Sequence, residues 1–481
     1  MSDHTSSSSS PIILAVIALA AAGAGAYFYL QPAEQAAPQP AIVEPVVEPE
    51  PEPIVEVTPE PEPVDPDLIE ESGDKPLAYD PYLADLGTRP DYNQLGIYQE
   101  TITRPDFERL LTKVYVVGDS WKEWISLFDD RAEIRSNRHQ PDEIFTLRFA
   151  PEQATQMAKL APKFWQKAAE LPATTIDKPL ADLVIAIDPG HIGGDYAQIE
   201  ERWYQIDDHC PVMEGEMVLV TAEIIKSQLE NLGAKVYLVR DENAPVSQLT
   251  IDDYQAAAAA KVEHYDITTP DATRKLQERY LYRTGEIRAR AELVNTQITP
   301  DLVLCLHFNA EAWDDPSNPT LTDKNHNHTL LHGALTKSEI AHDDERYEML
   351  LKILQGVHDE EKEIGKAAVT AMSKHTGLPN YEYEKNSRRA ISVDNFPGLW
   401  ARNLLANRLY QCPVIFYEPY VMNNEEVHAR VQAGDFEGEQ EVFGKMRRSI
   451  FREYADAVTE GLVKHYAGER KIDKASQNLS E

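Results

Sequence analysis

The stretch LVIAIDPGH (residues 183–191) decides the fold, because it joins a wholly apolar run to an abrupt turn. Five consecutive apolar residues are typical of a strand that is buried on both faces of a sheet, and Asp188-Pro189-Gly190 ends that run. The same pattern of a short apolar strand recurs in AKVYLV (234–239), LVLCLH (302–307) and PVIFYE (413–418). We therefore predict a buried sheet that contains these four strands.

Helical patterns separate the predicted strands. Residues 218–232 have the apolar spacing of an amphipathic helix, and Gly233 provides its C-cap. Residues 272–296 and 443–465 also have helical patterns. Strands that alternate with helices indicate an α/β fold, in which a mixed twisted sheet has helices on both faces. The sequence has no glycine-rich motif of the kind that binds nucleotides.

Composition and charge exclude several classes of function. The chain has 481 residues, with 46 Lys or Arg against 81 Asp or Glu, and its formal net charge at pH 7 is −35. Phosphate backbones require a basic surface, so we expect no nucleic-acid partner. Three cysteines without a C-x-x-C pair exclude a disulfide framework and a cysteine-only zinc site.

The first 74 residues differ from the rest of the chain. They contain 14 acidic residues and no Lys or Arg, so the remaining residues carry a net charge of −21. Residues 11–30 are 20 consecutive uncharged residues, enough to span a membrane. A cleaved signal peptide is the competing interpretation, but the missing basic n-region and the long apolar run favour a retained transmembrane helix. Residues 31–78 are rich in Pro and Glu, which predicts an extended, disordered linker.

The sequence also predicts how the chain is divided into parts. Region 79–171 is either an accessory domain or a structural extension of the following domain, and the sequence leaves both interpretations open. The predicted order is a short cytoplasmic N-terminus (1–10), a transmembrane anchor (11–30), a disordered linker (31–78), a globular region of unknown role (79–171), a catalytic domain (183–466) with an insert at about 311–358, and a polar tail (467–481).

Side chains of metal-binding or acid/base type stand where three predicted strands end. His191, His307 and Glu418 each follow one of these strands. Because ligands of an open α/β sheet bind at the carboxyl ends of its strands, we expect the three side chains to share one cleft. Glu214 and Glu216 begin a helix that could face the same cleft, and spacing alone does not choose between them. Two histidines and one carboxylate are typical of a hydrolytic zinc site, and a further carboxylate can act as the proton acceptor.

Three more histidines lie in the segment DKNHNHTLLH (323–332). His326 and His328 form an H-x-H pair, and His332 follows in a strand-like run. A second metal site is one interpretation of this pattern. Histidines in an exposed loop are the interpretation we favour.

The order of the motifs also resembles a known family. The relevant stretches are IAIDPGHIGG (185–194), EGEMVLVTAEII (214–225), RAELVN (290–295), DLVLCLHFNA (301–310) and PVIFYEPYVMNNEE (413–426). Together they resemble the zinc-dependent N-acetylmuramoyl-L-alanine amidases, the amidase_3 family, over about residues 183–465. The resemblance implies a phosphorylase/hydrolase-like amidase fold and a Zn²⁺ cofactor.

The resemblance assigns metal ligands by motif. It makes His191 and His307 the two histidine ligands of the zinc. In the family, the metal-binding Glu lies five residues before a helix Leu. That spacing matches Glu214 and Leu219, and so favours Glu214 over Glu216.

The resemblance also implies a catalytic residue and an activity. The family's catalytic Glu follows the last strand and precedes an Asn by six residues, which matches Glu418 and Asn424. The implied reaction is hydrolysis of the amide between N-acetylmuramic acid and L-alanine in peptidoglycan, during cell-wall remodelling or daughter-cell separation. With the predicted anchor, this places the chain in the inner (cytoplasmic) membrane as a single-pass protein whose catalytic domain lies in the periplasm or on the cell-wall side.

Some division-linked members of the family suggest a regulatory role for the insert. In them, an inserted helix covers the zinc until a protein activator removes it. Here a helix is predicted over residues 343–357, in an acid-rich stretch. We expect that a carboxylate of this helix could fill the open zinc position. The candidate residues are Asp343, Asp344, Glu345 and Glu348.

Two alternative functions remain open from the sequence. One is a catalytically silent amidase-like domain that binds the cell wall, although the presence of all four motif residues argues against it. The other is a zinc carboxypeptidase that acts on stem peptides. Such an enzyme needs a basic residue for the terminal carboxylate, and Arg388, Arg389 or Arg402 could provide it.

Overall fold

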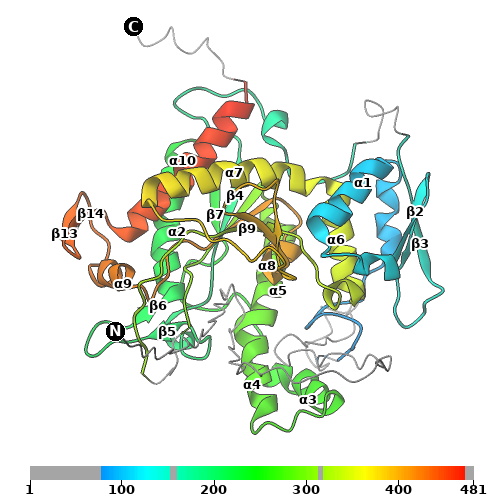
Figure 1. Cartoon of the computed structure of the whole chain (residues 1–481), viewed down its shortest axis with the longest axis horizontal. Coiled ribbons are helices and arrows are strands. Elements are labelled where there is room, and N and C mark those ends of the chain that lie inside the picture. The colour runs from blue at the N-terminus through cyan, green and yellow to red at the C-terminus, as the bar shows by residue number, and fades with distance from the viewer. Residues whose placement is uncertain (1–76, 78, 152–159, 313–317, 472–481) are drawn as a thin grey trace, which may run out of the picture.

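The computed structural model describes residues 77, 79–151, 160–312 and 318–471 (Figure 1). Within them, the largest sheet has seven strands in the order β10-β11-β9-β12-β8-β4-β7. Strands β12, β8, β4 and β7 run parallel, whereas β9 runs antiparallel to β12. The bounds are β4 Val184–Pro189, β7 Lys235–Leu238, β8 Leu302–Leu306, β9 Thr329–His332, β10 Ile391–Ser392, β11 Leu399–Arg402 and β12 Val414–Tyr417.

The carboxyl ends of the three central strands are level with one another. Leu306 of β8 pairs with Pro189 of β4 on one side and with Tyr417 of β12 on the other. Beyond these pairs, the Gly190 N–H donates to the Leu306 carbonyl and the His307 N–H donates to the Tyr417 carbonyl, both at 2.9 Å. The residues that follow the strands therefore start from one edge of the sheet.

Helices cover both faces of this sheet. Ile185 and Ile187 belong to a core shared with α2, α7 and α10, whereas Ala186 belongs to a second core with α5 and α8. Successive strand residues point to opposite faces, so a wholly apolar strand serves both cores. The predicted α/β fold, a mixed sheet with helices on both faces, is confirmed. The bounds are α2 Glu214–Asn231, α5 Glu286–Leu293, α7 Val357–Thr376, α8 Leu405–Leu409 and α10 Ile450–Glu469.

The helices lie close to their predicted positions, except at the start of the last one. The helix predicted from residue 443 begins only at Ile450, because β13 and β14 form a hairpin before it. Phe443 and Gly444 have positive φ angles of 52° and 70°, which suit a tight two-residue turn and not a helix. The other bounds are α4 Ala272–Arg279, η9 Tyr280–Gly285 and η10 Val294–Ile298, which with α5 form the helical run predicted over 272–296, and β13 Gln440–Val442 and β14 Lys445–Arg447.

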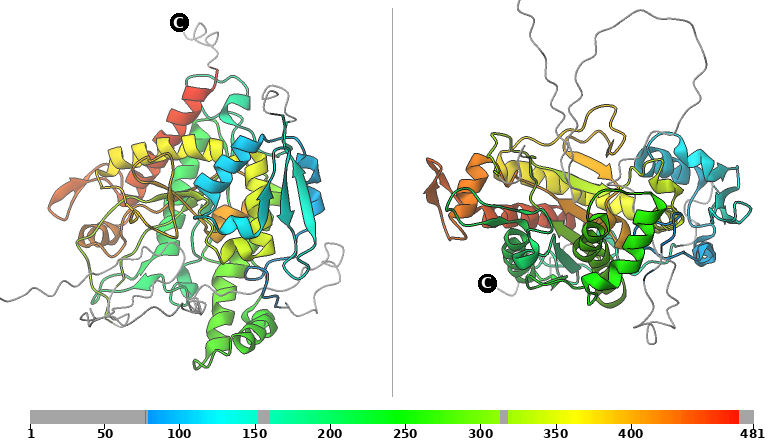
Figure 2. Two further views of the ribbon diagram at one scale, coloured as in Figure 1. Left: turned by 45° about the vertical axis from the view of Figure 1, so that its right-hand side comes forward. Right: turned by 90° about the horizontal axis from the view of Figure 1, so that it is seen from below.

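Region 79–171 packs directly onto the large sheet's domain (Figure 2). Most of its buried hydrophobic residues belong to the same core as those of α6, Asp343–Gln355. Nη1 of Arg89 lies 2.9 Å from Oδ2 of Asp343, and the Tyr92 hydroxyl donates to the Asp343 carbonyl at 2.8 Å. A shared core favours a structural extension over a separate accessory domain. The bounds are η2 Tyr92–Tyr98, α1 Arg104–Leu110, η3 Leu111–Tyr115, η4 Ser120–Glu123, β1 Ile125–Leu127, β2 Arg131–Arg135, β3 Ile144–Arg148 and η6 Ala168–Glu170.

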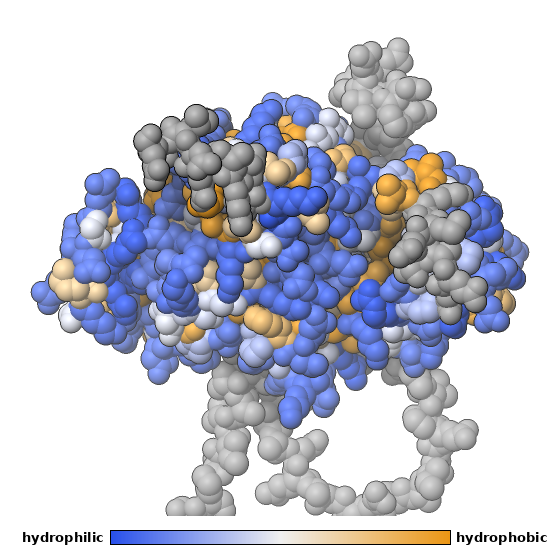
Figure 3. Space-filling model, turned by 90° about the horizontal axis from the view of Figure 1, so that it is seen from above, coloured by the Kyte–Doolittle hydropathy of each residue, from blue (hydrophilic) through white to orange (hydrophobic). Residues whose placement is uncertain are grey.

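The remaining elements lie at the periphery of the sheet. Helices α3 and α4 extend from the lower side of the molecule in Figure 1. The face seen in Figure 3 is largely hydrophilic, as expected from the charge of the chain. The bounds of the peripheral elements are η7 Gly194–Tyr196, β5 Trp203–Tyr204, β6 Val212–Met213, η8 Ile251–Tyr254, α3 Gln255–His264, η11 Glu339–Ala341 and α9 Glu425–Gln432.

The structure contradicts the predicted location in the inner membrane. A membrane span needs about 20 predominantly apolar residues in one helix. None of the helices in the described part of the chain combines that length with that apolar character. The predicted anchor (11–30) and N-terminus (1–10) lie outside the described residues, as does the linker (31–78) apart from residue 77. We therefore correct the single-pass assignment made from the sequence.

His358 on α7 makes stability depend on pH. Its side chain is 2% exposed, and burial lowers its pKa to about 4. In the unfolded chain His358 takes up a proton near pH 6.5. Its contribution to the free energy of unfolding is therefore fully present above that pH and is lost as the pH falls toward 4. By pH 5 the loss from this one group amounts to about 2 kcal/mol.

We expect His358→Phe to reduce the acid sensitivity of the fold by about that amount, because phenylalanine keeps the edge-on packing against Tyr115 but binds no proton. Denaturant unfolding at pH 7.5 and pH 5 measures this difference. If the free energy of unfolding differs between the two pH values by as much in the variant as in the original protein, His358 is not the group that titrates.

Candidate active site

The four predicted site residues lie at one edge of the large sheet. His191 lies two residues beyond the end of β4, whereas His307 and Glu418 directly follow β8 and β12. Glu214 is the first residue of α2. Because the strand ends are level, these segments can converge, as expected for the carboxyl edge of an α/β sheet.

His191, Glu214 and His307 form a compact cluster of metal-binding atoms. One such atom from each residue lies within 4.8 Å of the others. Oε2 of Glu214 lies 3.3 Å from Nε2 of His191, and Oε1 lies 3.0 Å from Nδ1 of His307. Glu214 is 1% exposed, whereas Glu216 is partly exposed and outside the cluster. The geometry thus selects Glu214 from the two acids that spacing left open.

The charges inside the cluster stabilise one another. Burial by itself would raise the pKa of Glu214, but His191 and His307 lower it well below its ordinary value. Burial would likewise lower the pKa of His191, yet Glu214 and Glu200 raise it. Arg202 adds another positive charge, with Nε 3.2 Å from Glu214. Glu214 is therefore held in its ionised form, which is the form that binds a cation.

A second buried carboxylate, Glu200, holds the turn that carries His191. Its oxygens accept the N–H groups of Ile192 and Gly193 at 2.9 and 3.0 Å, and Oε1 lies 3.5 Å from Nδ1 of His191. His191 has a left-handed backbone with φ 58°, which costs a residue other than glycine about 1–3 kcal/mol. The hydrogen bonds of Glu200 help to hold this conformation. The sequence analysis missed Glu200, because a single acid in a loop has no spacing that marks it.

Two buried arginines hold the same turn. Nε of Arg240 and Nη2 of Arg290 both donate to the carbonyl of His191, each at 2.8 Å. Arg290 also forms a 2.8 Å ion pair with Asp188. Arg240 donates to the carbonyl of Gly215 at 2.6 Å, which ties the turn to the first turn of α2. Neither contact was predicted, since both arginines are far from the turn in sequence.

Glu418 is a buried carboxyl group beside the cluster. It is 1% exposed, and burial raises its pKa to about 7. The charge of His307 lowers this pKa and that of Glu214 raises it, so Glu418 senses the cluster directly. A carboxyl group with a pKa near neutral pH can both accept and release a proton.

The histidines of segment 323–332 are buried, so the prediction of exposed loop histidines is wrong. The segment leads into β9, the antiparallel neighbour of β12, and this pairing brings His328 next to Glu418. Tyr381 and Tyr383 pack against the His328 ring. Burial lowers the pKa of His328 to about 3, so its ring is neutral and can donate Nδ1–H to Glu418 Oε2 at 3.1 Å. The exposed fractions are 9% for His326, 1% for His328 and 0% for His332.

The carboxylates of α6 are engaged away from the cluster. This corrects the expectation that a helix over 343–357 supplies a carboxylate to the metal position. None of these carboxylates belongs to the group of clustered ligand atoms. The helix instead connects region 79–171 to α8. The contacts are Asp343 with Arg89 (2.9 Å) and Arg346 (2.6 Å), Asp344 with the Ala84 N–H (2.9 Å), and Glu345 and Glu348 with Arg408 (2.7 and 2.6 Å).

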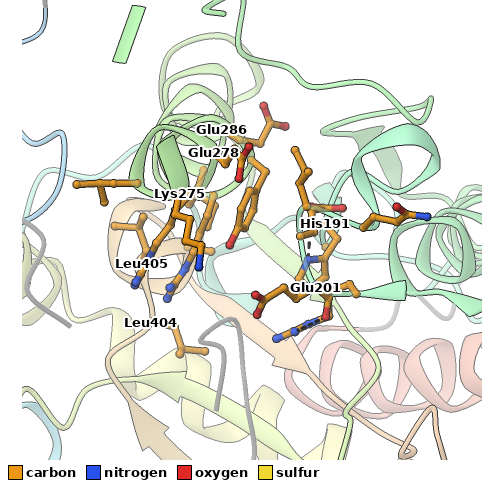
Figure 4. A pocket seen from close by; sticks show the side chains of 18 of the residues that line it. His191, Glu201, Lys275, Glu278, Glu286, Leu404 and Leu405 are labelled. Carbon is orange, nitrogen blue, oxygen red and sulfur yellow. Dashed lines mark hydrogen bonds and ion pairs between the residues drawn. The ribbon is translucent and has the colours of Figure 1, made fainter. Parts of the chain in front are cut away.

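A cavity of about 590 Å³ opens beside the cluster (Figure 4). His191 and His307 form part of its wall, and Lys275 of α4 and the pair Leu404 and Leu405 form another part. We refer to it as the cluster cavity. It gives a ligand room to lie against His191 and His307.

The donor set fits a divalent metal ion. Two imidazole nitrogens and one carboxylate oxygen leave the fourth position of a tetrahedral site open. Nε2 of His191 is buried and makes no hydrogen bond within the described residues, as expected for a ring nitrogen that binds a metal. In the described part of the chain, this is the one group of three or more such residues whose ligand atoms come so close.

Comparisons with known proteins find distant similarity only. No family model and no curated protein matches the sequence. Among solved structures, the chain is similar to the CwlD amidase from Clostridioides difficile in complex with the GerS lipoprotein (13% identity, 59% of this chain and 98% of that chain, TM-score 0.33). It is also similar to the N-acetylmuramyl-L-alanine amidase Ami1 from Mycobacterium abscessus (16% identity, 60% and 99%, TM-score 0.33). Similarity this distant decides neither fold nor activity, which rest on the topology and the site.

Gly190 makes the close approach of the turn to His307 feasible. A Cβ at this position would overlap the His307 ring. We expect Gly190→Ala to lower the free energy of unfolding by about 1–3 kcal/mol, because the ring must move in a packed site. Gly96→Ala is the matched control, since a Cβ there meets nothing within 4 Å, and we expect a change within about 0.5 kcal/mol. Equal denaturation midpoints for the two variants would contradict this account of the turn.

Proposed function

We propose that this chain is a zinc-dependent N-acetylmuramoyl-L-alanine amidase of peptidoglycan. The observation that carries the proposal is the meeting of His191, Glu214 and His307 within 4.8 Å, with Glu418 buried beside them. These residues stand at the motif positions on which the sequence resemblance to that family rests. A zinc hydrolase requires three such ligands and a carboxyl group that can exchange a proton.

The roles of the residues follow from their contacts. His191, Glu214 and His307 would hold the zinc, which when bound would lower the pKa of a water molecule and polarise the scissile carbonyl. Glu418, with a pKa of about 7, accepts the proton of the attacking water and returns it to the leaving amine of L-alanine. His328 keeps the Glu418 carboxyl group in one orientation through its hydrogen bond of 3.1 Å.

A zinc carboxypeptidase acting on stem peptides is the second candidate. Arg388, Arg389 and Arg402 line a cavity that adjoins the cluster cavity, so basic groups for a terminal carboxylate lie nearby. The proposed metal ligands and Glu418 would serve either hydrolase. The two activities therefore differ in their products and not in their central residues.

Product analysis separates these functions. The full-length chain is incubated with purified peptidoglycan and zinc, with and without a chelator, and the products are identified by mass spectrometry. We expect free stem peptides that begin with L-alanine, intact glycan strands, and loss of both products with chelator. Release of a terminal D-residue alone would support the carboxypeptidase, and no zinc-dependent product would support a silent wall-binding domain.

Two substitutions separate metal binding from proton transfer. We expect Glu418→Gln to retain zinc and to lower turnover about 10²–10⁴-fold, because the amide cannot accept the proton. His191→Ala should lose both zinc and turnover, since it removes a ligand. Zinc content per chain and the rate of peptide release measure the two effects.

Glu216→Gln serves as the control, because this acid lies two residues from Glu214 but outside the cluster. It should retain zinc and activity. An active Glu418→Gln protein would show that another group accepts the proton.

A further inference from the structure

A second, larger cavity adjoins the cluster cavity, and its wall is basic. It has a volume of about 1000 Å³ and is lined by eight Lys or Arg against five Asp or Glu. In the whole chain the balance is the reverse, with 46 basic against 81 acidic residues. We refer to it as the arginine cavity. A basic wall in so acidic a protein favours an anionic ligand.

The two cavities meet along a shared wall. Arg279, Arg283, Leu404 and Leu405 line both of them. Arg279 ends α4 and Arg283 lies four residues later in η9, so the two side chains leave neighbouring helical turns on the same side. A ligand that extends from the cluster cavity into the arginine cavity therefore passes the wall that carries both guanidinium groups and the two leucines.

Arg279 and Arg283 make no ion pair within the described residues, and the acid whose charge acts on each of them is the buried Asp85. Their side chains form no hydrogen bond or ion pair there, and Nε of Arg279 is buried without a partner. Burial, reinforced by the neighbouring charge of Arg279, lowers the pKa of Arg283 to about 9. The charge of Asp85 acts on both arginines, but the direct contacts of its Oδ1 atom are with Nζ of Lys261 at 3.5 Å and with the hydroxyl of Tyr280 at 3.0 Å.

Two partly buried arginines without an ion pair of their own destabilise a fold, because each loses part of its hydration and Asp85 offsets their charge only in part. Such a cost is common at binding sites, where the ligand supplies the missing partner. The missing partner here is an anion that can reach the shared wall of the two cavities. A ligand already bound at the cluster meets this condition.

We propose that Arg279 and Arg283 form a subsite for a free carboxylate of the stem peptide, on the leaving-group side of the scissile amide. This inference rests on the amidase function proposed above. Stem peptides carry free carboxylates, and the planar guanidinium group binds a carboxylate through two parallel hydrogen bonds. Leu404 and Leu405 line both cavities beside the two arginines and would contact the apolar part of the peptide.

The test compares two soluble muramoyl peptides with the zinc-loaded, full-length chain. One has free carboxylates on its stem peptide, and in the other these carboxylates are amidated. We expect amidation to raise KM roughly 10- to 100-fold with little change in kcat, because charge-assisted hydrogen bonds are lost. Arg283→Met should raise KM for the free acid by a similar factor and leave KM for the amidated peptide unchanged.

Two controls distinguish a binding role from a structural one. Arg274→Met removes an arginine of α4, the helix directly before η9. Arg274 is ion-paired with Glu278 at 2.9 Å and lines neither of these two cavities, so its substitution should leave KM unchanged. Arg283→Met should keep or raise the thermal midpoint, because it removes a cation without a partner. A lower midpoint with an unchanged KM would overturn the proposal and assign Arg283 a structural role.

A binding measurement separates this inference from the proposed activity. Calorimetry records binding of the isolated stem peptide to Glu418→Gln protein, which requires no turnover. Binding that depends on the carboxylates and on Arg283 supports the subsite even if no muramoyl peptide is cleaved. If muramoyl peptides are cleaved but neither amidation nor Arg283→Met changes KM, the subsite is refuted and the proposed amidase activity is not. Competition by inorganic phosphate as strong as that by the peptide would overturn the carboxylate assignment.

Discussion

Arg240 and Arg290 donate to one backbone oxygen, the carbonyl of His191, and the geometry of the site depends on that shared contact. A carbonyl oxygen has two lone pairs, so two guanidinium groups can bind it at once. With Glu200 bound to the N–H groups that follow, the turn is fixed by charged groups on both its oxygen and its nitrogen side. The left-handed conformation of His191 is thus maintained by residues that are not themselves proposed metal ligands. Supporting residues of this kind commonly fix the orientation of metal-binding side chains.

Local patterns were sufficient to predict four of the seven strands of the sheet and the points at which they end. Apolar runs that stop at a polar residue identify a buried strand without knowledge of its neighbours, so the segments before His191, His307 and Glu418 were placed correctly. The choice between Glu214 and Glu216 was different. Residues two apart on a helix point about 200° apart, so only one can face the cluster, and the spacing within a single helix does not say which.

The supporting contacts could not be predicted, because they join residues distant in the sequence. Glu200 sits in a loop with no periodic pattern, and His328 meets Glu418 only because β9 runs antiparallel to β12. An acid-rich helix such as α6 has the same composition whether its carboxylates serve as a lid or as partners for buried arginines. Arg89 and Arg408 decide that question here, and their positions are a property of the tertiary fold.

The reversed direction of β9 has a further consequence for how such a site can change over evolution. The proposed metal ligands are attached to β4, β8 and α2, whereas the environment of Glu418 also depends on the segment that enters β9 from the opposite direction. Substitutions before β9 can therefore change the pKa of Glu418, while the contacts that hold the proposed metal ligands stay the same. The proposed metal ligands and the proposed proton acceptor therefore have partly different supports, although the charges of His307 and Glu214 still act on Glu418.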